Sequence, residues 1–83
     1  MRFKWTEWNR AHIARRPVVE REAEEAIRAR RSTHHVRRDG TAVTEGRTKA
    51  GRHLFVVWRE EEATDILAVL ESVIFVITAF EVD

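Results

Sequence analysis

The chain has 83 residues, no cysteine and a formal net charge of +1. This length allows a single domain, residues 1–83, and the lack of cysteine excludes disulfides, thiolate chemistry and cysteine-based zinc sites. The charge is divided, because residues 1–38 hold 11 Lys and Arg against 5 Asp and Glu, whereas residues 39–83 hold 4 against 9. Most of the basic residues are arginine, which binds phosphate in a bidentate manner. The pattern is typical either of a nucleic-acid-binding surface or of solvated helices in an arginine-rich protein.

The sequence predicts no membrane-spanning segment and no secretory signal. The longest apolar stretch, residues 66–80, is interrupted by Glu71 and Ser72 and is shorter than the roughly 20 residues that a membrane helix needs. The N-terminus carries Arg2 and Lys4 where a signal peptide would begin its apolar segment. We therefore expect a cytoplasmic protein.

Two helices are expected near the N-terminus, after a short strand at residues 3–5. Thr6 can cap a first helix that runs to about Arg15, and Pro17 ends it because the residue before a proline avoids helical geometry. Pro17 also suits the first turn of a second helix over residues 18–30. Four apolar residues of this second helix share one face at helical spacing: Val19, Ala23, Ala26 and Ile27. Its glutamates do not converge, so they predict a solvated face rather than a metal site.

The second half reads as strands joined by turns: strand 33–38, a two-residue hairpin turn at Asp39-Gly40, strand 41–48, turn 49–51, strand 52–58, charged loop 59–62 and strand 73–80. Residues 64–71 fit either a short helix or an extension of the last strand. The predicted fold class is α+β, with two N-terminal helices packed on an antiparallel sheet of about four strands.

The first helix carries the first candidate functional residues. Asn9, His12 and Arg16 share one face, and Arg15 lies on another. A histidine and an arginine one turn apart could protonate a leaving oxygen and hold a phosphate. The alternative is that His12 lies at the edge of the core and the arginines are solvated. The three tryptophans could stack on bases, but we expect them in the core: Trp5, Trp8 and Trp58.

A second candidate cluster surrounds the turn at residues 49–51. Arg47 and Arg52 bracket this turn, and Lys49 lies within it, so the three cations could converge on one phosphate. A solvated hairpin end is an equally good interpretation. His34 and His35 are adjacent in a strand and point to opposite faces, which argues against a shared metal ion.

Several short motifs follow one another along the chain in an order that matches a known family. They are Phe3-Lys4-Trp5, Asn9, Ile13, Arg15-Arg16-Pro17-Val18, Glu22-Ala23-Glu24-Glu25-Ala26, Gly46-Arg47-Thr48-Lys49-Ala50-Gly51-Arg52 with the apolar strand that follows it, and Ile77-Thr78-Ala79-Phe80. In this order the chain resembles the BrnT-type toxins of bacterial type II toxin–antitoxin systems, which are small ribonucleases with a RelE-like fold.

The resemblance implies a metal-independent endoribonuclease that cleaves mRNA, needs no cofactor and is neutralised by a cognate antitoxin protein. In such enzymes the RNA 2′-hydroxyl is the nucleophile and basic side chains stabilise the phosphate. The site would comprise catalytic residues His12, Arg15, Arg16 and Arg47, and substrate-binding residues Asn9, Lys49 and Arg52. His12 is the expected proton donor.

Some residues depart from the family pattern and support an alternative. Arg15-Arg16 stand where the family has Lys-His, and Phe80 stands where it has an arginine. Residues 59–71 read as an insertion, and the usual C-terminal helix does not follow the last strand. A catalytically inactive member that binds a protein or RNA is the alternative function. Strand 73–80 would then bind an antitoxin or form a homodimer, and binding of RNA or DNA without cleavage is a third possibility.

Overall fold

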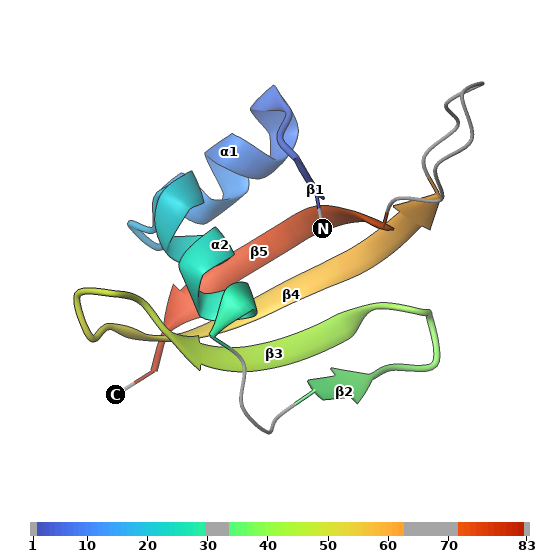
Figure 1. The fold of residues 1–83 in the computed structure, drawn as a ribbon. Coiled ribbons are helices and arrows are strands. Elements are labelled where there is room, and N and C mark those ends of the chain that lie inside the picture. The colour runs from blue at the N-terminus through green and yellow to red at the C-terminus, as the bar shows by residue number, and fades with distance from the viewer. Residues whose placement is uncertain (1, 30–33, 63–71, 83) are drawn as a thin grey trace.

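A computed structural model describes residues 2–29, 34–62 and 72–82. They form an α+β domain in which two helices pack on a five-stranded sheet (Figure 1). The elements in chain order are β1 (Arg2–Lys4), α1 (Glu7–Ala14), α2 (Glu20–Arg28), β2 (His34–Val36), β3 (Ala42–Arg47), β4 (His53–Glu62) and β5 (Ser72–Glu81). The predicted fold class is therefore confirmed.

The sheet is mixed rather than antiparallel. Its strand order is β1-β5-β4-β3-β2, and only the edge pair β1–β5 is parallel. The N-terminal strand thus lies beside the last strand of the sheet, with Phe3 opposite Ile74. The prediction of antiparallel pairing throughout was wrong at this edge, because α1 and α2 carry the chain away from β1 before the meander β2–β5 begins.

The first helix begins and ends where its sequence signals predict. The Thr6 side chain accepts a hydrogen bond from the Asn9 backbone, and the Asn9 side chain accepts one from the Thr6 backbone at 2.6 Å. This reciprocal capping box satisfies two backbone donors at the start of α1. The second helix begins later than expected, at Glu20, where the Glu22 side chain reaches back to the backbone N–H of Val19. Pro17 consequently lies in the connection, not in the first turn of α2.

Both hairpin turns use a glycine with a positive φ angle. Gly40 has φ of 87° and Gly51 has φ of 88°, a conformation that residues with a Cβ adopt only with strain. In the first turn the backbone N–H of Arg37 bonds the carbonyl of Thr41, so three residues separate the paired positions. The prediction of a two-residue turn at Asp39-Gly40 was wrong, although its glycine is the residue that permits the turn.

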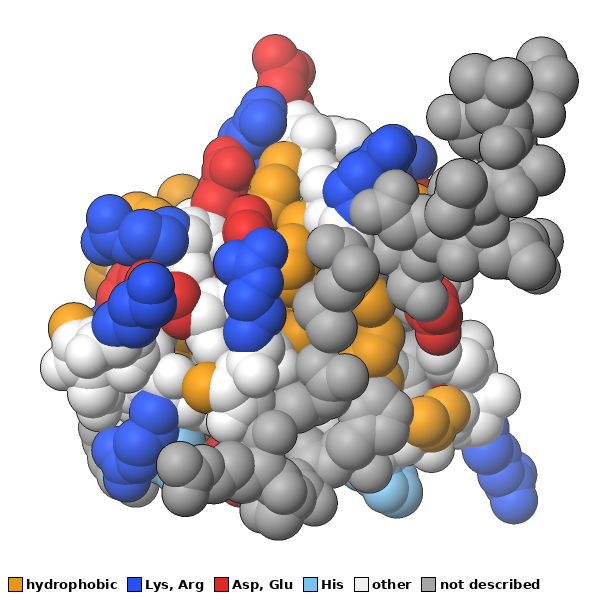
Figure 2. Space-filling model, viewed as in Figure 1, with side chains coloured by type: hydrophobic (Ala, Val, Ile, Leu, Met, Phe, Trp, Pro, Cys, Tyr) orange, Lys and Arg blue, Asp and Glu red, His pale blue; other side chains and the backbone are white. Residues whose placement is uncertain are grey.

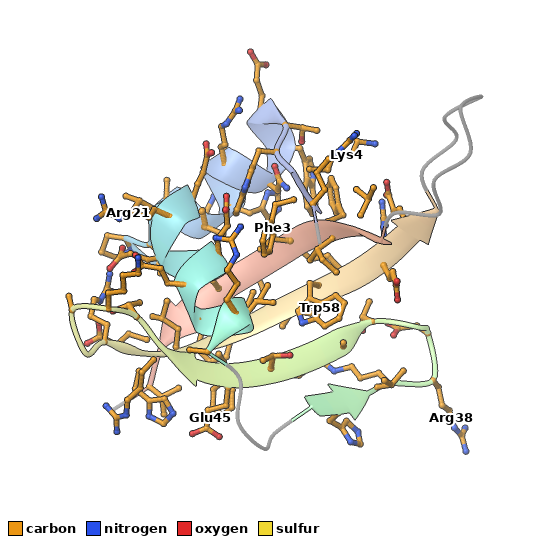
Figure 3. All side chains as sticks on the ribbon, in the orientation of Figure 1. Phe3, Lys4, Arg21, Arg38, Glu45 and Trp58 are labelled. Atoms are coloured by element: carbon orange, nitrogen blue, oxygen red, sulfur yellow. The ribbon has the colours of Figure 1, made fainter. Side chains whose placement is uncertain are left out.

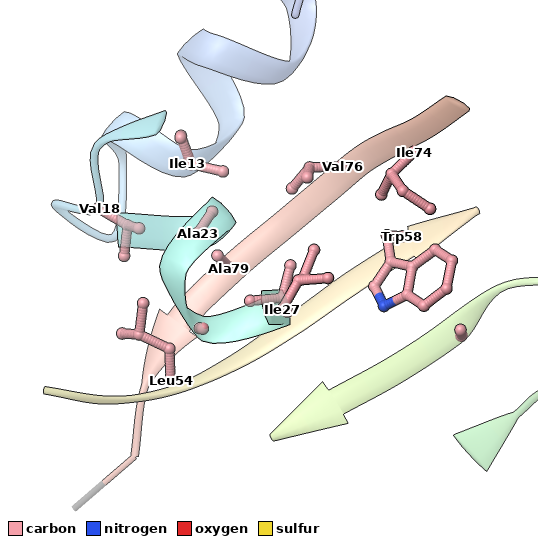
Figure 4. Packing of buried hydrophobic residues seen from close by; sticks show 12 residues of the cluster. Ile13, Val18, Ala23, Ile27, Leu54, Trp58, Ile74, Val76 and Ala79 are labelled. Atoms are coloured by element: carbon pink, nitrogen blue, oxygen red, sulfur yellow. The ribbon is translucent and has the colours of Figure 1, made fainter. Parts of the chain in front are cut away.

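The core lies between the helices and one face of the sheet (Figure 4). Ile13 and Ile27 point from the helices onto alternate residues of the central strands, which are buried: Leu54, Val56, Trp58, Ile74, Val76 and Ala79. A Cβ built on Gly46 would lie 2.0 Å from the carbonyl oxygen of Ala26, so α2 rests directly on the β3 backbone at this glycine. The indole N–H of Trp58 donates to the Thr44 hydroxyl at 2.9 Å.

Two further predictions about local structure need correction. Residues 59–62, expected to be a charged loop, continue β4 and pair with residues 72–75 of β5. Of the tryptophans expected in the core, Trp58 is buried and Trp5 is half-buried, but Trp8 is 50% exposed. The expectation for residues 64–71 lies outside the described residues. Within the described segments, no helix is long and apolar enough to cross a membrane.

Candidate nucleic-acid-binding and catalytic site

The charges on the helices are largely balanced by one another. Arg10 pairs with Glu20, and two i, i+4 pairs run along α2: Arg21 with Glu25 and Arg28 with Glu24. Figure 2 shows basic and acidic side chains side by side over this part of the molecule. The helix surface therefore has little excess positive charge for an anionic ligand.

The sheet has a second face that α2 does not cover and that α1 meets only at the β5 edge, where Trp8 stacks near Phe75. Because side chains alternate along a strand, the neighbours of the buried core residues point to this side. We call it the open face, and its central rows across β3, β4 and β5 are Glu45–Phe55–Phe80 and Val43–Val57–Thr78. Figure 3 shows Glu45 pointing away from the helices and Trp58 pointing toward them.

Aromatic rings and an arginine lie in line across the open face. The rings of Phe55 and Phe80 are 5.6 Å apart between centroids and tilted by 51°, and both residues are partly exposed. The guanidinium of Arg16 lies 5.7 Å from the centroid of Phe80, within the range of a cation–π contact. The connection after α1 thus brings a predicted site residue to the edge of the sheet beside β5.

His53 stands next to this aromatic pair, held by a carboxylate. Its Nε2 atom contacts Oε1 of Glu45, and its ring lies 6.4 Å from that of Phe55. Both side chains of the His53–Glu45 pair are a little over a quarter exposed, so solvent and ligands reach them. A carboxylate on one ring nitrogen fixes the tautomer and leaves the other nitrogen, Nδ1, to exchange a proton. Such a pair can serve as a general base or acid.

Arg47 lies directly beside His53. The two residues pair across β3 and β4, and Arg47 donates from Nη1 to the carbonyl of Gly51 at 3.2 Å. Among the described residues, no carboxylate forms an ion pair with Arg47 or Arg16. Both guanidinium groups can therefore bind a phosphate without first breaking a salt bridge.

An open pocket of about 880 Å³ adjoins this pair at the β3 side of the molecule. Glu45, Arg47 and His53 line it from the sheet, and Lys49 lines it from the β3–β4 turn. From α2 it is lined by Arg21, Glu25 and Arg28, of which Arg21 pairs with Glu25 and Arg28 with Glu24, so cations outnumber carboxylates in the lining. A concave site with one excess charge sign concentrates ligands of the opposite charge. The pocket fits a phosphate group next to the His53–Glu45 pair.

His12, the predicted proton donor, lies on α1 next to Trp8. Its ring stacks on that of Trp8 at 3.7 Å between centroids, and its Nδ1 atom is 2.7 Å from the Trp8 carbonyl oxygen. Trp8 in turn stacks near Phe75 of β5 at 6.0 Å, and Arg59 covers the same phenyl ring. His12 therefore borders the open face, one helical turn before Arg16.

Arg52, predicted to bind substrate, points to the other side of the sheet. Its Nη1 atom donates to both carboxylate oxygens of Glu22, at 2.9 and 2.7 Å, and its Nε atom contacts Glu81. Burial alone would raise the pKa of Glu22, but the bonds from Arg52 and from the Val19 backbone lower it overall. Arg52 thus joins α2, β4 and β5, and its charge is already compensated.

The three remaining residues that were predicted to form the site do not lie together in the structure. Asn9 is fully buried, and its side-chain amide donates to the carbonyl of Lys4 while it caps α1, so it has a structural role. Arg15 is exposed at the end of α1. Lys49 is exposed, and its backbone N–H bonds Glu25.

The sequence reasoning missed His53 and Glu45. Both residues were visible, since His53 begins a strand six residues after Arg47, and strand alternation places it on the same face as Phe55. What was not used was the register, because the predicted turn at residues 49–51 already sets Arg47 opposite His53 and Glu45 opposite Phe55. A three-residue turn ending in a left-handed Gly51 is the signal that would have supplied this register.

Searches of protein-family models, of curated proteins and of solved structures found no match to this chain.

Proposed function

We propose that this domain is a metal-independent endoribonuclease that cleaves mRNA, acting as the toxin of a toxin–antitoxin pair. One observation carries the proposal: His53, oriented by Glu45, lies beside Arg47 at a pocket lined by further cations. These are the parts that cleavage by the RNA 2′-hydroxyl needs, namely a proton acceptor and positive charge next to a phosphate. The resemblance to BrnT-type toxins supports the same reaction class.

The reaction follows from these parts. The 2′-oxygen attacks the adjacent phosphorus, and its proton passes to Nδ1 of His53. The bond from phosphorus to the 5′-oxygen breaks, and that oxygen takes a proton from solvent. The products carry a 2′,3′-cyclic phosphate and a 5′-hydroxyl. Arg47 stabilises the charge that develops on the phosphate oxygens, which is the role in which a permanently protonated guanidinium is effective.

The proposal also includes a protein partner. An antitoxin would neutralise the enzyme by covering the open face, where Phe55 and Phe80 are partly exposed. A cytoplasmic location follows from mRNA as the substrate.

The test is cleavage of a labelled single-stranded RNA in the presence of EDTA. We expect products with 2′,3′-cyclic phosphate ends, and no cleavage at a position where deoxyribose removes the 2′-hydroxyl. His53→Ala is expected to lower the rate at least about 100-fold, because a positioned proton-transfer group contributes that much or more. Equal rates for His53→Ala and the wild-type protein would refute this assignment.

Two histidine variants serve as controls. His35→Ala changes an exposed histidine of β2 and should leave the rate unchanged. His12→Ala tests the residue predicted from sequence, and a larger loss there than in His53→Ala would move the proton-transfer role to α1.

A second candidate function is RNA binding without turnover. It is favoured by Phe80, which stands where the family has an arginine and contacts Arg16 instead of supplying a cation itself. RNA affinity that falls steeply with salt, together with full-length RNA after long incubation, would identify this function.

A further inference from the structure

We propose that Phe55 and Phe80, with Arg16 above Phe80, form a base-stacking platform that restricts the protein to single-stranded RNA. The inference rests on the proposed function and adds the conformation of the substrate. It also assigns a role to Phe80, which replaces a cation of the family pattern. We call Phe55, Phe80 and Arg16 the platform.

The first argument is accessibility. Core residues on the opposite side of the same strands are sealed, for example Leu54 and Val56 at 0% exposure. Phe55 and Phe80 are partly exposed, and none of the described helices rests on them. Two adjacent phenyl rings that remain accessible on a sheet are the arrangement on which unpaired bases stack.

The second argument is the position of the charges. Arg16 forms the β5 end of the platform, and the His53–Arg47 pair flanks the platform on the β3 side. Across three strands these arginines are separated by roughly 10 Å or more. The two arginines are therefore far enough apart to bind successive phosphates of one RNA strand that crosses the platform, rather than a single phosphate. The guanidinium of Arg16 can itself stack on a base.

The third argument concerns strandedness. In a duplex the bases are stacked on one another and paired, and the major groove of an RNA helix is too deep and narrow for side chains to read. The open face of the sheet would therefore contact only the sugar–phosphate backbone of a duplex. Bases of a single strand can turn onto the rings, so the platform favours single strands over duplexes.

The charges also decide between RNA and a second copy of this chain. A symmetric dimer through the open face would place Arg16 and Arg47 of both copies in one interface, where the nearby carboxylate of Glu45 is already paired with His53. A polyanion that carries bases satisfies both the cations and the rings.

The test compares affinities for a short fluorescent 2′-O-methyl RNA, which cannot be cleaved because its 2′-oxygen is blocked. The probes are the single strand, a hairpin duplex of the same composition, and inorganic polyphosphate, which has charge but no bases. Phe80→Leu keeps apolar volume and removes the ring, and Phe80→Trp restores a ring. We expect Phe80→Leu to weaken single-strand binding about tenfold, Phe80→Trp to restore it, and polyphosphate binding to stay unchanged.

Four outcomes would overturn the platform. They are unchanged single-strand affinity in Phe80→Leu, an equal loss of polyphosphate binding, a wild-type preference for the hairpin, or a dimer that dissociates on Phe80→Leu in light scattering. If Phe80→Leu fails to fold, as judged by its thermal unfolding curve, Phe55→Leu repeats the comparison. If the platform binds as expected but unmodified RNA stays intact, the proposed cleavage fails and the platform stands.

Discussion

The two faces of the same three strands differ in burial and in charge. On the helix-covered face, alternate residues of β4 are buried against α2, and the indole of Trp58 is satisfied by Thr44. On the open face, Arg47, His53 and Phe55 are exposed or partly exposed neighbours, whereas Val57 further along β4 is buried. If the proposed function holds, alternate residues of one strand contribute to stability and to ligand binding. Substitutions at adjacent positions should therefore separate effects on stability from effects on ligand binding.

The largest effect is expected at Gly46, where helix and sheet touch. In Gly46→Ala the new methyl group would meet the Ala26 carbonyl at 2.0 Å, so α2 must move away from β3. We expect a loss of at least about 3 kcal/mol in the free energy of unfolding, because backbone cannot repack as a side chain does. Chemical denaturation followed by circular dichroism measures it.

Gly40→Ala is the matched control for this substitution. No atom lies within 4 Å of a Cβ built there, but its φ is +87°. Only the left-handed backbone should matter, at about 1–2 kcal/mol. Equal losses at Gly40 and Gly46 would show that steric contact with α2 is not what requires glycine in β3.

The next prediction compares the effects on stability and on cleavage of substituting two adjacent residues, Leu54 and His53. Leu54→Ala removes a fully buried side chain and should cost about 2–5 kcal/mol of stability, while the protein that remains folded still binds RNA. His53→Ala should lower stability by less than about 1 kcal/mol, since surface substitutions do little, and yet remove cleavage. Denaturation and cleavage assays on the same two preparations give the comparison. A reversed pattern, with stability lost at His53 and activity lost at Leu54, would contradict the division between faces.

The third comparison concerns Arg52, which joins α2 to the ends of β4 and β5, and its expected effect on stability is smaller than those at Gly46 and Leu54. Arg52→Ala removes the guanidinium whose Nη1 donates to both oxygens of Glu22 and should cost about 1.5–3 kcal/mol at neutral pH. Because the folded pKa of Glu22 is lowered, its contribution is complete above its unfolded pKa of about 4.3 and is lost as the pH falls through the folded value. The wild-type protein should therefore lose stability in acid, and Arg52→Ala should lose less over the same range.

Arg59→Ala is the control for that experiment. Arg59 also pairs with a glutamate, Glu61, but its side chain is about half exposed. Its removal should cost less than about 1 kcal/mol, because water already screens such a pair. A cost as large as that of Arg52→Ala would indicate that burial does not set the strength of these ion pairs.

Several features of the fold were predictable because their signals are local. Thr6 and Asn9 cap α1 within one turn, and Gly40 and Gly51 permit turns through their own φ angles. The alternation around Leu54 predicts a central strand whatever its neighbours are. Residues 59–62 were misread because their charges are typical of a loop, whereas pairing with β5 keeps them in a strand, with Glu61 bonded to Lys4 and Arg59.

The sequence by itself determined the class of the fold, the cap of α1, the glycines of the two hairpin turns, and the supply of arginines, histidines and aromatic rings. The tertiary structure alone decided that β1 runs parallel to β5, that Arg52 faces Glu22 while Arg47 faces the pocket, and that His53 meets Glu45. The physical reason is range. Caps and turns depend on residues a few positions apart, whereas the pairing of β1 with β5 and of Arg52 with Glu22 joins residues far apart in the sequence.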